Sequence, residues 1–279
     1  MAGSLAAARV LSATLIAELL GLGMVSGFLA GLLGVGGGML MVPFITLILS
    51  HRGVAPGMAV KMAIATAMAT ILFTSLSSVR AHHQRGAVRW PLVRGLAPGI
   101  VAGGLLAGAG AFALIKGQAL ALLFALVNTF AAAQILLDRK PKPSRTVPGN
   151  AGLVAVGGAM GFVASLAGAG GAFMSVPFMT WCNVPIRVAV GTSAALGFPI
   201  ALASTLGYVI SGWHLEPALP GAFGYLYLPA LAIIALASVT MAPLGARVAH
   251  GSDVRVLKRL FAFLLLGLAG YMLYQSQSG

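Results

Sequence analysis

The sequence predicts an all-α protein that crosses a membrane many times. Of its 279 residues, 59% are hydrophobic and 8% are charged, and the mean hydropathy is +1.00. A soluble domain has roughly 25% charged residues, so a soluble enzyme, a secreted disulfide scaffold and a disordered chain are excluded. The 38 glycines and 14 prolines fit this class, because both residues are commoner in membrane helices than in soluble ones. The long apolar runs lack the alternation of barrel strands and therefore indicate helices.

The apolar runs divide into ten segments, and a helix needs about 20 apolar residues to cross a bilayer. The first five segments are residues 10–33, 38–50, 57–79, 91–115 and 117–137, and the second five are 151–168, 172–183, 186–211, 222–246 and 254–274. Between them lies a polar stretch, DRKPKPSRTVPG, whose prolines and basic residues predict a surface linker. We therefore expect two membrane repeats, residues 10–137 and 150–274, and a linker over 138–149.

For three of these segments, apolar character alone does not decide how the segment sits in the membrane. The first carries a single charge, Arg9, and no small-residue cleavage site ends it, so we expect a mature segment rather than a signal peptide. Segments 38–50 and 172–183 are short. Each either crosses the membrane or forms a re-entrant hairpin with the segment before it, which gives eight to ten membrane segments in total.

The second half of the chain repeats the first. Residues 27–47 (GFLAGLLGVGGGMLMVPFITL) and 161–181 (GFVASLAGAGGAFMSVPFMTW) are identical at 11 of 21 positions without gaps. The match resumes between KMAIATA (61–67) and RVAVGTS (187–193). A shared apolar composition would not place the same glycines, proline and threonine in register, so we interpret the two halves as structural repeats.

The distribution of charge predicts the topology. The net charge is +13, and basic residues in short loops hold membrane helices in orientation, so nucleic acid is not an expected partner. If the linker is cytoplasmic, loops 80–90 and 247–259 are cytoplasmic too, and loop 212–221, which has no Lys or Arg, lies outside. Four basic residues then fall outside, which are Arg9, Arg52, Lys61 and Lys116. Each repeat has an odd number of crossings, so the repeats have inverted topology.

Inverted repeats with short, glycine-interrupted segments are a pattern of secondary transporters, whose binding site lies near the midplane. The candidate site is the pair of glycine loops before the short segments. Glycine permits close backbone approach and positive φ, and the helix that follows presents unpaired N–H groups to an anion. The loop glycines are Gly34, Gly36, Gly37, Gly38, Gly168, Gly170 and Gly171. The alternative is helix packing through small residues, which we expect for Gly27, Gly31 and Gly161.

Hydroxyl and basic side chains extend this candidate site. Thr66, Thr192 and Ser193 could donate hydrogen bonds to an oxyanion, or could instead bond the carbonyl one turn earlier in their own helix. Lys61 and Arg187 occupy matched positions, one near each face. They could draw an anion into each vestibule by steering, or could be interfacial side chains that snorkel.

Other polar residues have weaker signals. Glu18 lies within the first segment, and an intramembrane carboxylate suggests proton coupling unless it sits at the interface. His82 and His83 are expected at the surface of a cytoplasmic loop. Cys182, the single cysteine, excludes an intrachain disulfide and is expected to be a small buried hydrophobe. No metal-ligand motif or Walker A sequence is present, so we expect no metal, no cofactor and no ATP hydrolysis.

The doubled glycine-rich block ending in VPF, the ATA and GTS triplets and AHHQRGAVRW (81–90) resemble the TauE/SafE family of sulfite exporters. The resemblance implies export of a sulfur-containing anion, sulfite or an organosulfonate, across the bacterial inner membrane. It also implies a site role for Gly34, Gly36, Gly37, Thr66, Gly168, Gly170, Gly171, Thr192 and Ser193. The sequence departs from the family pattern at Ala65 and Ala67, which stand where the first-half triplet would have glycine and serine.

Three other functions remain open beside a secondary transporter. A passive anion channel would show no saturation and no counterflow. An intramembrane serine hydrolase would require a GxSxG nucleophile elbow, but GTSAA (191–195) lacks the last glycine. A cation or metal carrier would require oxygen, nitrogen or thiolate ligands along its path. The chain has only 4 acidic residues, which argues against this function. The expected partners are a small anion and the lipid bilayer, and a homo-oligomer is open only because symmetric assembly is common.

Overall fold

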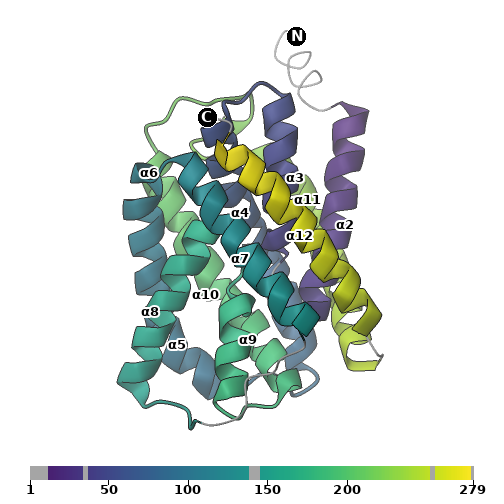
Figure 1. Ribbon diagram of the computed structural model, residues 1–279, viewed down its shortest axis with the longest axis vertical. Coiled ribbons are helices and arrows are strands. Elements are labelled where there is room, and N and C mark those ends of the chain that lie inside the picture. The colour runs from purple at the N-terminus through teal and green to yellow at the C-terminus, as the bar shows by residue number, and fades with distance from the viewer. Residues whose placement is uncertain (1–11, 34–36, 138–144, 252–254, 278–279) are drawn as a thin grey trace.

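The computed structural model describes residues 12–33, 37–137, 145–251 and 255–277, which are almost wholly helical (Figure 1). The first half contains α2 (Ala13–Leu33), α3 (Gly38–His51), α4 (Pro56–His83), α5 (Trp90–Leu105), the π-helical turn η1 (Leu106–Ala111), α6 (Phe112–Leu114) and α7 (Gly117–Leu137). The second half contains α8 (Asn150–Ala167), α9 (Ala172–Trp181), α10 (Ile186–Gly212), the strands β1 (Ala222–Phe223) and β2 (Leu226–Tyr227), α11 (Leu228–Gly251) and α12 (Arg255–Gln277). Eight of the described helical stretches are long and apolar enough to cross a membrane, so the prediction of an all-α polytopic membrane protein is confirmed.

All ten predicted segments correspond to helices, and three of their ends differ from the prediction by four or more residues. The segment expected to end at residue 246 continues to Gly251, so the loop expected to begin at residue 247 is helical at its start. The segment expected to end at residue 79 continues to His83, so the loop expected to begin at residue 80 is helical over its first turn. The segment expected to begin at residue 222 begins instead at Leu228. Gly221 and Gly224 adopt positive φ there, and the residues that follow them form the antiparallel hairpin of β1 and β2.

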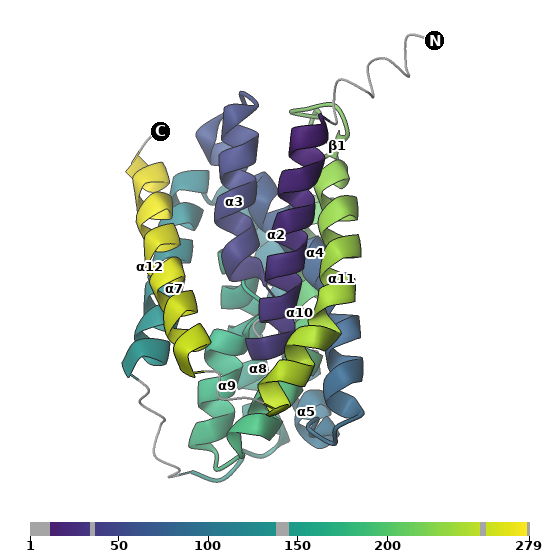
Figure 2. The same cartoon turned by 90° about the vertical axis from the view of Figure 1, so that its right-hand side faces the viewer.

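The two short helices each form a hairpin with the helix before them. The helix α3 returns toward the end of the molecule at which α2 starts, and α9 returns toward the end at which α8 starts (Figures 1 and 2). In Figure 2, α3 lies above α9, and the N-terminal ends of both point toward the middle of the molecule. The helices α2 and α8 are long enough to cross a membrane, whereas α3 and α9, with 14 and 10 residues, are shorter than the described spans.

Small residues let the hairpins pack closely on their neighbours. The helix α2 packs on α11, and a Cβ at Gly27 or Gly31 would overlap the α11 backbone. The helix α8 packs on α5 in the same way, and a Cβ at Gly161 would overlap the α5 backbone. These three glycines are therefore packing glycines, as predicted, because only a residue without a side chain allows this approach.

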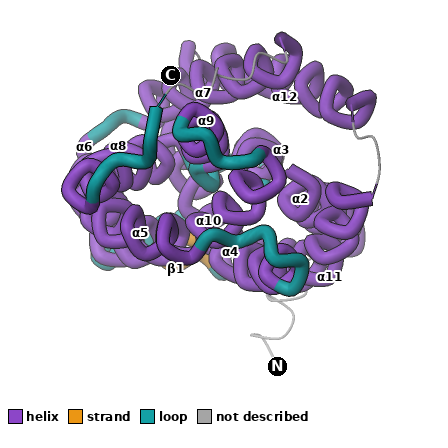
Figure 3. Tube along the Cα trace, turned by 90° about the horizontal axis from the view of Figure 1, so that it is seen from below, coloured by secondary structure: helices purple, strands orange, loops and turns teal. Residues whose placement is uncertain are grey.

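The helices α4 and α10 form the centre of the molecule. They have the most buried spans of the described helices, and they pack on each other. The helices α7 and α12 pack along each other as a separate layer beside α3 and α9 (Figure 3). Apolar side chains of this layer, such as Val127 and Leu265, join Leu32, Met39 and Phe173 of the hairpins in one cluster. The hairpin tips are thus covered by α7 and α12.

Candidate functional site

The two glycine loops have the same geometry where each short helix begins. Gly37 precedes α3 with φ 75°, and Gly171 precedes α9 with φ 76°, both in the left-handed region that glycine adopts without strain. Neither helix start has a side-chain capping hydrogen bond. The first-turn N–H groups of a helix have no partner within the helix, so these groups are directed out of the ends of α3 and α9.

The hairpin tips also touch each other. Gly38 opens α3, and a Cβ at this position would overlap the carbonyl oxygen of Gly168. Gly168 ends α8 with φ 63°, and a Cβ there would lie 2.9 Å from Val42 of α3. The structure thus brings the predicted loops of the two halves together, with Gly170 buried beside Gly171. The other predicted glycines, Gly34 and Gly36, lie outside the described residues.

The predicted threonines make matched contacts that the sequence did not suggest. Oγ1 of Thr66 accepts a hydrogen bond from the backbone N–H of Tyr227, at 3.0 Å, just before α11 begins. Oγ1 of Thr192 accepts one from the backbone N–H of Arg89, also at 3.0 Å, just before α5 begins. Each hydroxyl anchors the start of a helix and still has its own hydrogen to donate.

Ser193 connects α10 to a hairpin helix. It is fully buried, and its Oγ accepts a hydrogen bond from Ser175 of α9 at 2.8 Å. The matched position in the first half is Ala67, which is also buried but offers no hydroxyl. The two halves therefore differ in polarity beside their hairpins.

A further pair of matched contacts holds the ends of α2 and α8. Nε2 of His82 on α4 lies 3.2 Å from the carbonyl oxygen of Gly31, and the hydroxyl of Tyr208 on α10 donates to the carbonyl of Ser165. His82 is fully buried, so the expectation that it lies at the surface is wrong. The reason is that α4 extends through this residue. Its neighbour His83 is exposed, as expected.

The predicted basic residues lie away from the hairpin tips. Lys61 donates a hydrogen bond from Nζ to the carbonyl of Ala113 at 2.9 Å, at the end of α6. Its ammonium group also lies 5.9 Å from the centre of the Phe112 ring and 5.7 Å from that of Tyr225. Arg187 is exposed at the start of α10. Figure 1 places the starts of α4 and α10 at opposite ends of the molecule, so these two charges lie one at each end.

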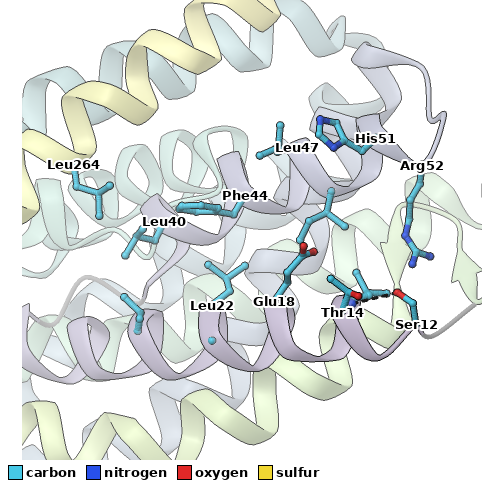
Figure 4. A pocket seen from close by; sticks show the side chains of 14 residues that line it. Ser12, Thr14, Glu18, Leu22, Leu40, Phe44, Leu47, His51, Arg52 and Leu264 are labelled. Carbon is cyan, nitrogen blue, oxygen red and sulfur yellow. Dashed lines mark hydrogen bonds between the residues drawn. The ribbon is translucent and has the colours of Figure 1, made fainter.

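Glu18 lines a groove between α2 and α3. The groove has a volume of about 660 Å³ and mostly apolar walls, and His51 and Arg52 line it too. Figure 4 shows the Glu18 carboxylate directed from α2 toward α3. Because Glu18 is exposed, it is not a buried charge within the bundle.

One buried polar residue near the hairpin tips was missed at the level of sequence. Asn128 of α7 is fully buried, and its Nδ2 donates a hydrogen bond to the carbonyl of Met39 at 3.3 Å. An amide in the middle of an apolar span was the signal that could have identified it, because polar groups inside membrane segments are costly.

The described core contains neutral polar groups. Among the described residues, none of the buried polar side chains is Asp, Glu, Lys or Arg. The described residues also contain no group of three or more His, Cys, Asp or Glu that could hold a metal ion. The groups near the hairpin tips can bind a solute through N–H, O–H and amide contacts.

Comparison with known proteins identifies the family. A family model described as "Sulfite exporter TauE/SafE" matches residues 19–272. The chain belongs to the TauE/SafE family. This TauE/SafE protein is 33% identical over 249 residues to a "probable membrane transporter protein" of Haemophilus influenzae, covering 88% of this chain and 94% of that one. No solved structure matches the chain.

More distant relatives have similar names. The "probable membrane transporter protein YunE" of Bacillus subtilis is 28% identical over 227 residues, which are 72% of this chain and 82% of the relative. The "probable membrane transporter protein MJ0441" of Methanocaldococcus jannaschii is 24% identical over 255 residues, which are 89% and 91% of the two chains. The predicted family is confirmed, and with it a membrane transporter.

Proposed function

We propose that this TauE/SafE protein is a secondary transporter that exports a small sulfur-containing anion, sulfite or an organosulfonate, across the bacterial inner membrane. The family and its relatives support the transporter class. The observation that carries the choice of an anion is the pair of glycine-capped helix starts in hairpin tips that touch each other through Gly38 and Gly168.

Helix starts suit an anion that must be released again. The helices α3 and α9 have 14 and 10 residues, and the N-terminus of a helix carries a partial charge of roughly +0.5. Two such ends attract an oxyanion within the bundle, where water does not screen them. Neutral donors bind it less tightly than a buried Lys or Arg would, so the anion can leave on either side.

The proposed site combines backbone and hydroxyl groups. Gly37, Gly38, Gly168, Gly170 and Gly171 allow close approach of backbone N–H groups, and Gly34 and Gly36 belong to the proposal through their match in the repeat. Thr66, Thr192 and Ser193 donate from their hydroxyls. Lys61 and Arg187 steer anions toward opposite ends of the molecule, since exposed charges raise the local concentration of an oppositely charged solute.

We further propose that the halves, residues 10–137 and 150–274, are inverted repeats. Matched contacts support this relation. The pairing of α2 with α11 corresponds to that of α8 with α5, and the bond between Thr66 and Tyr227 corresponds to that between Thr192 and Arg89. In such transporters, one repeat rocks against the other around a central site.

The membrane potential can drive the proposed export. An interior-negative potential expels an anion with about 2.3 kcal/mol per charge per 100 mV, so export needs no coupled ion. A passive channel would use the same force. Counterflow distinguishes a carrier from a channel, because only a carrier accumulates labelled substrate in exchange for unlabelled substrate on the other side of the membrane.

The test uses purified protein in liposomes with a sulfite gradient, at two membrane potentials and two pH gradients. We expect saturable sulfite flux with counterflow. Gly171→Leu should abolish it, since position 171 has positive φ and a Cβ there would overlap Ile200. Gly270→Leu on α12 is the control, because nothing lies within 4 Å of its Cβ position. Absence of flux for sulfite and all sulfonates through folded protein would refute the proposal.

Glu18 is the proposed site of any proton coupling. Its carboxylate lines a groove that also has the imidazole of His51 as a lining group. If flux responds to the pH gradient, Glu18→Gln should remove that response while leaving the response to membrane potential. A pH response that survives this substitution would exclude Glu18.

A further inference from the structure

Asn128 is a buried polar side chain that the proposed site does not yet use. It lies near the middle of α7 (Gly117–Leu137) and is fully buried. Its neighbour Val127 belongs to the apolar cluster that includes Met39 and Phe173 of the hairpins. A polar group in such surroundings is costly unless its hydrogen-bonding atoms are paired, so Nδ2 and Oδ1 of this amide each require a hydrogen-bond partner.

The orientation of the amide is fixed by α3. Nδ2 of Asn128 lies 3.3 Å from the carbonyl oxygen of Met39. This carbonyl lacks its usual helical partner, because the residue four positions later is Pro43, which has no N–H. A carbonyl oxygen only accepts hydrogen bonds, so the amide nitrogen must face it and Oδ1 must face the other way.

Oδ1 is therefore an acceptor in need of a donor. It is buried, and among the described residues it has no hydrogen-bond partner. Met39 is the second residue of α3, so this acceptor lies at the same helix start as Gly37 and Gly38. The helix-start N–H groups, the hydroxyls and the basic side chains of the proposed site act as donors, whereas Oδ1 accepts. An oxyanion with only lone pairs would satisfy the N–H groups and be repelled by Oδ1.

We propose that Oδ1 of Asn128 accepts a hydrogen bond from the transported anion. The site then favours an oxyanion that carries an O–H or N–H, such as hydrogensulfite or a hydroxysulfonate, over one that carries none. This inference rests on the proposed function and specifies the chemistry of its substrate. A hydrogen on the solute pairs with Oδ1 while its oxygens pair with the helix starts.

The test compares two sulfonates of nearly the same size, hydroxyethanesulfonate and propanesulfonate, which differ by O–H against CH₃. Each competes with sulfite for flux through the full-length protein in liposomes. We expect wild-type protein to prefer the hydroxyl compound by about tenfold, the scale of one hydrogen bond with a buried acceptor. Asn128→Leu should bring the ratio near one. Thr129→Val is the control, because Thr129 is exposed and bonds Ala125 of its own helix.

A second arm tests the inorganic substrate. Sulfite flux is measured at fixed total sulfite and several pH values, with the pH equal on both sides of the membrane. Wild-type flux should rise as sulfite takes up its proton, and the rise should be weaker in Asn128→Leu than in Thr129→Val. These two arms distinguish a hydroxysulfonate from hydrogensulfite as the source of the hydrogen.

The outcomes separate this inference from the proposed function. Wild-type sulfite flux without either preference would overturn the role of Asn128 and leave the transporter intact, and a resident water would then pair with Oδ1. Equal preferences in Asn128→Leu and wild type would also overturn it. If Asn128→Leu does not fold, the wild-type ratio of the two sulfonates decides. Failure to move any anion would overturn both proposals.

Discussion

At the scale of single residues, the contact between the hairpin tips depends on Gly38. Gly38→Ala would place a Cβ against the carbonyl oxygen of Gly168 and 2.9 Å from Ile71. The φ of Gly38 is not positive, so the effect is steric alone. We expect a loss of about 1–3 kcal/mol in the free energy of unfolding, the usual cost of overpacking, and reduced sulfite flux.

A glycine of the same hairpin provides the control for Gly38→Ala. Nothing lies within 4 Å of a Cβ at Gly21 of α2, so Gly21→Ala should keep or raise stability, because alanine favours helix by up to ~1 kcal/mol. Thermal unfolding in detergent and flux in liposomes measure both variants. Equal stability of the two would mean that the tips do not pack as closely as described.

Cys182 offers a second test at this scale. Burial raises the pKa of its thiol, and the nearby Arg145 guanidinium lowers it by a smaller amount. Only the thiolate reacts with alkylating agents, so Cys182 should react slowly at neutral pH, with a rate that rises at higher pH than for an ordinary thiol. Arg145→Gln should raise the pKa further and slow the reaction. Alkylation followed by mass spectrometry measures both rates, and a profile like that of an exposed thiol would contradict the burial.

At the scale of helices, the threonine contacts fix where α5 and α11 begin. Thr66→Val removes the acceptor of the buried Tyr227 N–H, and an unsatisfied buried donor costs about 1–3 kcal/mol. We expect a lower unfolding temperature for Thr66→Val, whereas Thr66→Ser keeps the oxygen and should remain near wild type. If valine is tolerated as well as serine, this hydrogen bond does not hold β2 and α11 on α4.

Helices were predicted well from sequence, and their ends were predicted less well. The apolar runs located all ten, because a helix in lipid must be apolar along its length. The last turn of α4 was missed since its polar residues, such as Arg80, have the composition of a loop. The residues of β1 and β2 were predicted to be helical because they are apolar and directly precede the apolar run of α11. Segment length did not decide between a crossing and a hairpin for α3 and α9.

The candidate site was predicted in part. The repeat identified the glycine loops, because two matched blocks marked the same positions. The contact of Gly38 with Gly168 depends on how the hairpins pack, which no local pattern encodes. Asn128 has no match in a motif, and its importance depends on Pro43, which is distant in sequence and leaves a carbonyl without a donor.

At the scale of the whole molecule, the distribution of basic residues predicts which end of the helix bundle faces the cytoplasm. The C-terminal ends of α4, α7 and α11 lie toward one end of the molecule, and the strand β1, which pairs with β2, lies at the other (Figure 2). Among the described residues, Arg80, Arg85 and Arg247 lie near the first of these ends, while the loop that precedes β1 has no Lys or Arg. By the positive-inside rule, the first end should face the cytoplasm.

Labelling from either side of the membrane tests this orientation. In a Cys182→Ala background, Gln84→Cys places a thiol at the end of α4, and His214→Cys places one in the loop before β1; both positions are exposed. An impermeant maleimide added to intact cells should label position 214 and not position 84, because the basic end faces inward. Both should react once the membrane is permeabilised, which shows that each thiol is accessible. Labelling of position 84 from outside would reverse the orientation, and Lys61 would then lie at the cytoplasmic end and Arg187 at the outer end.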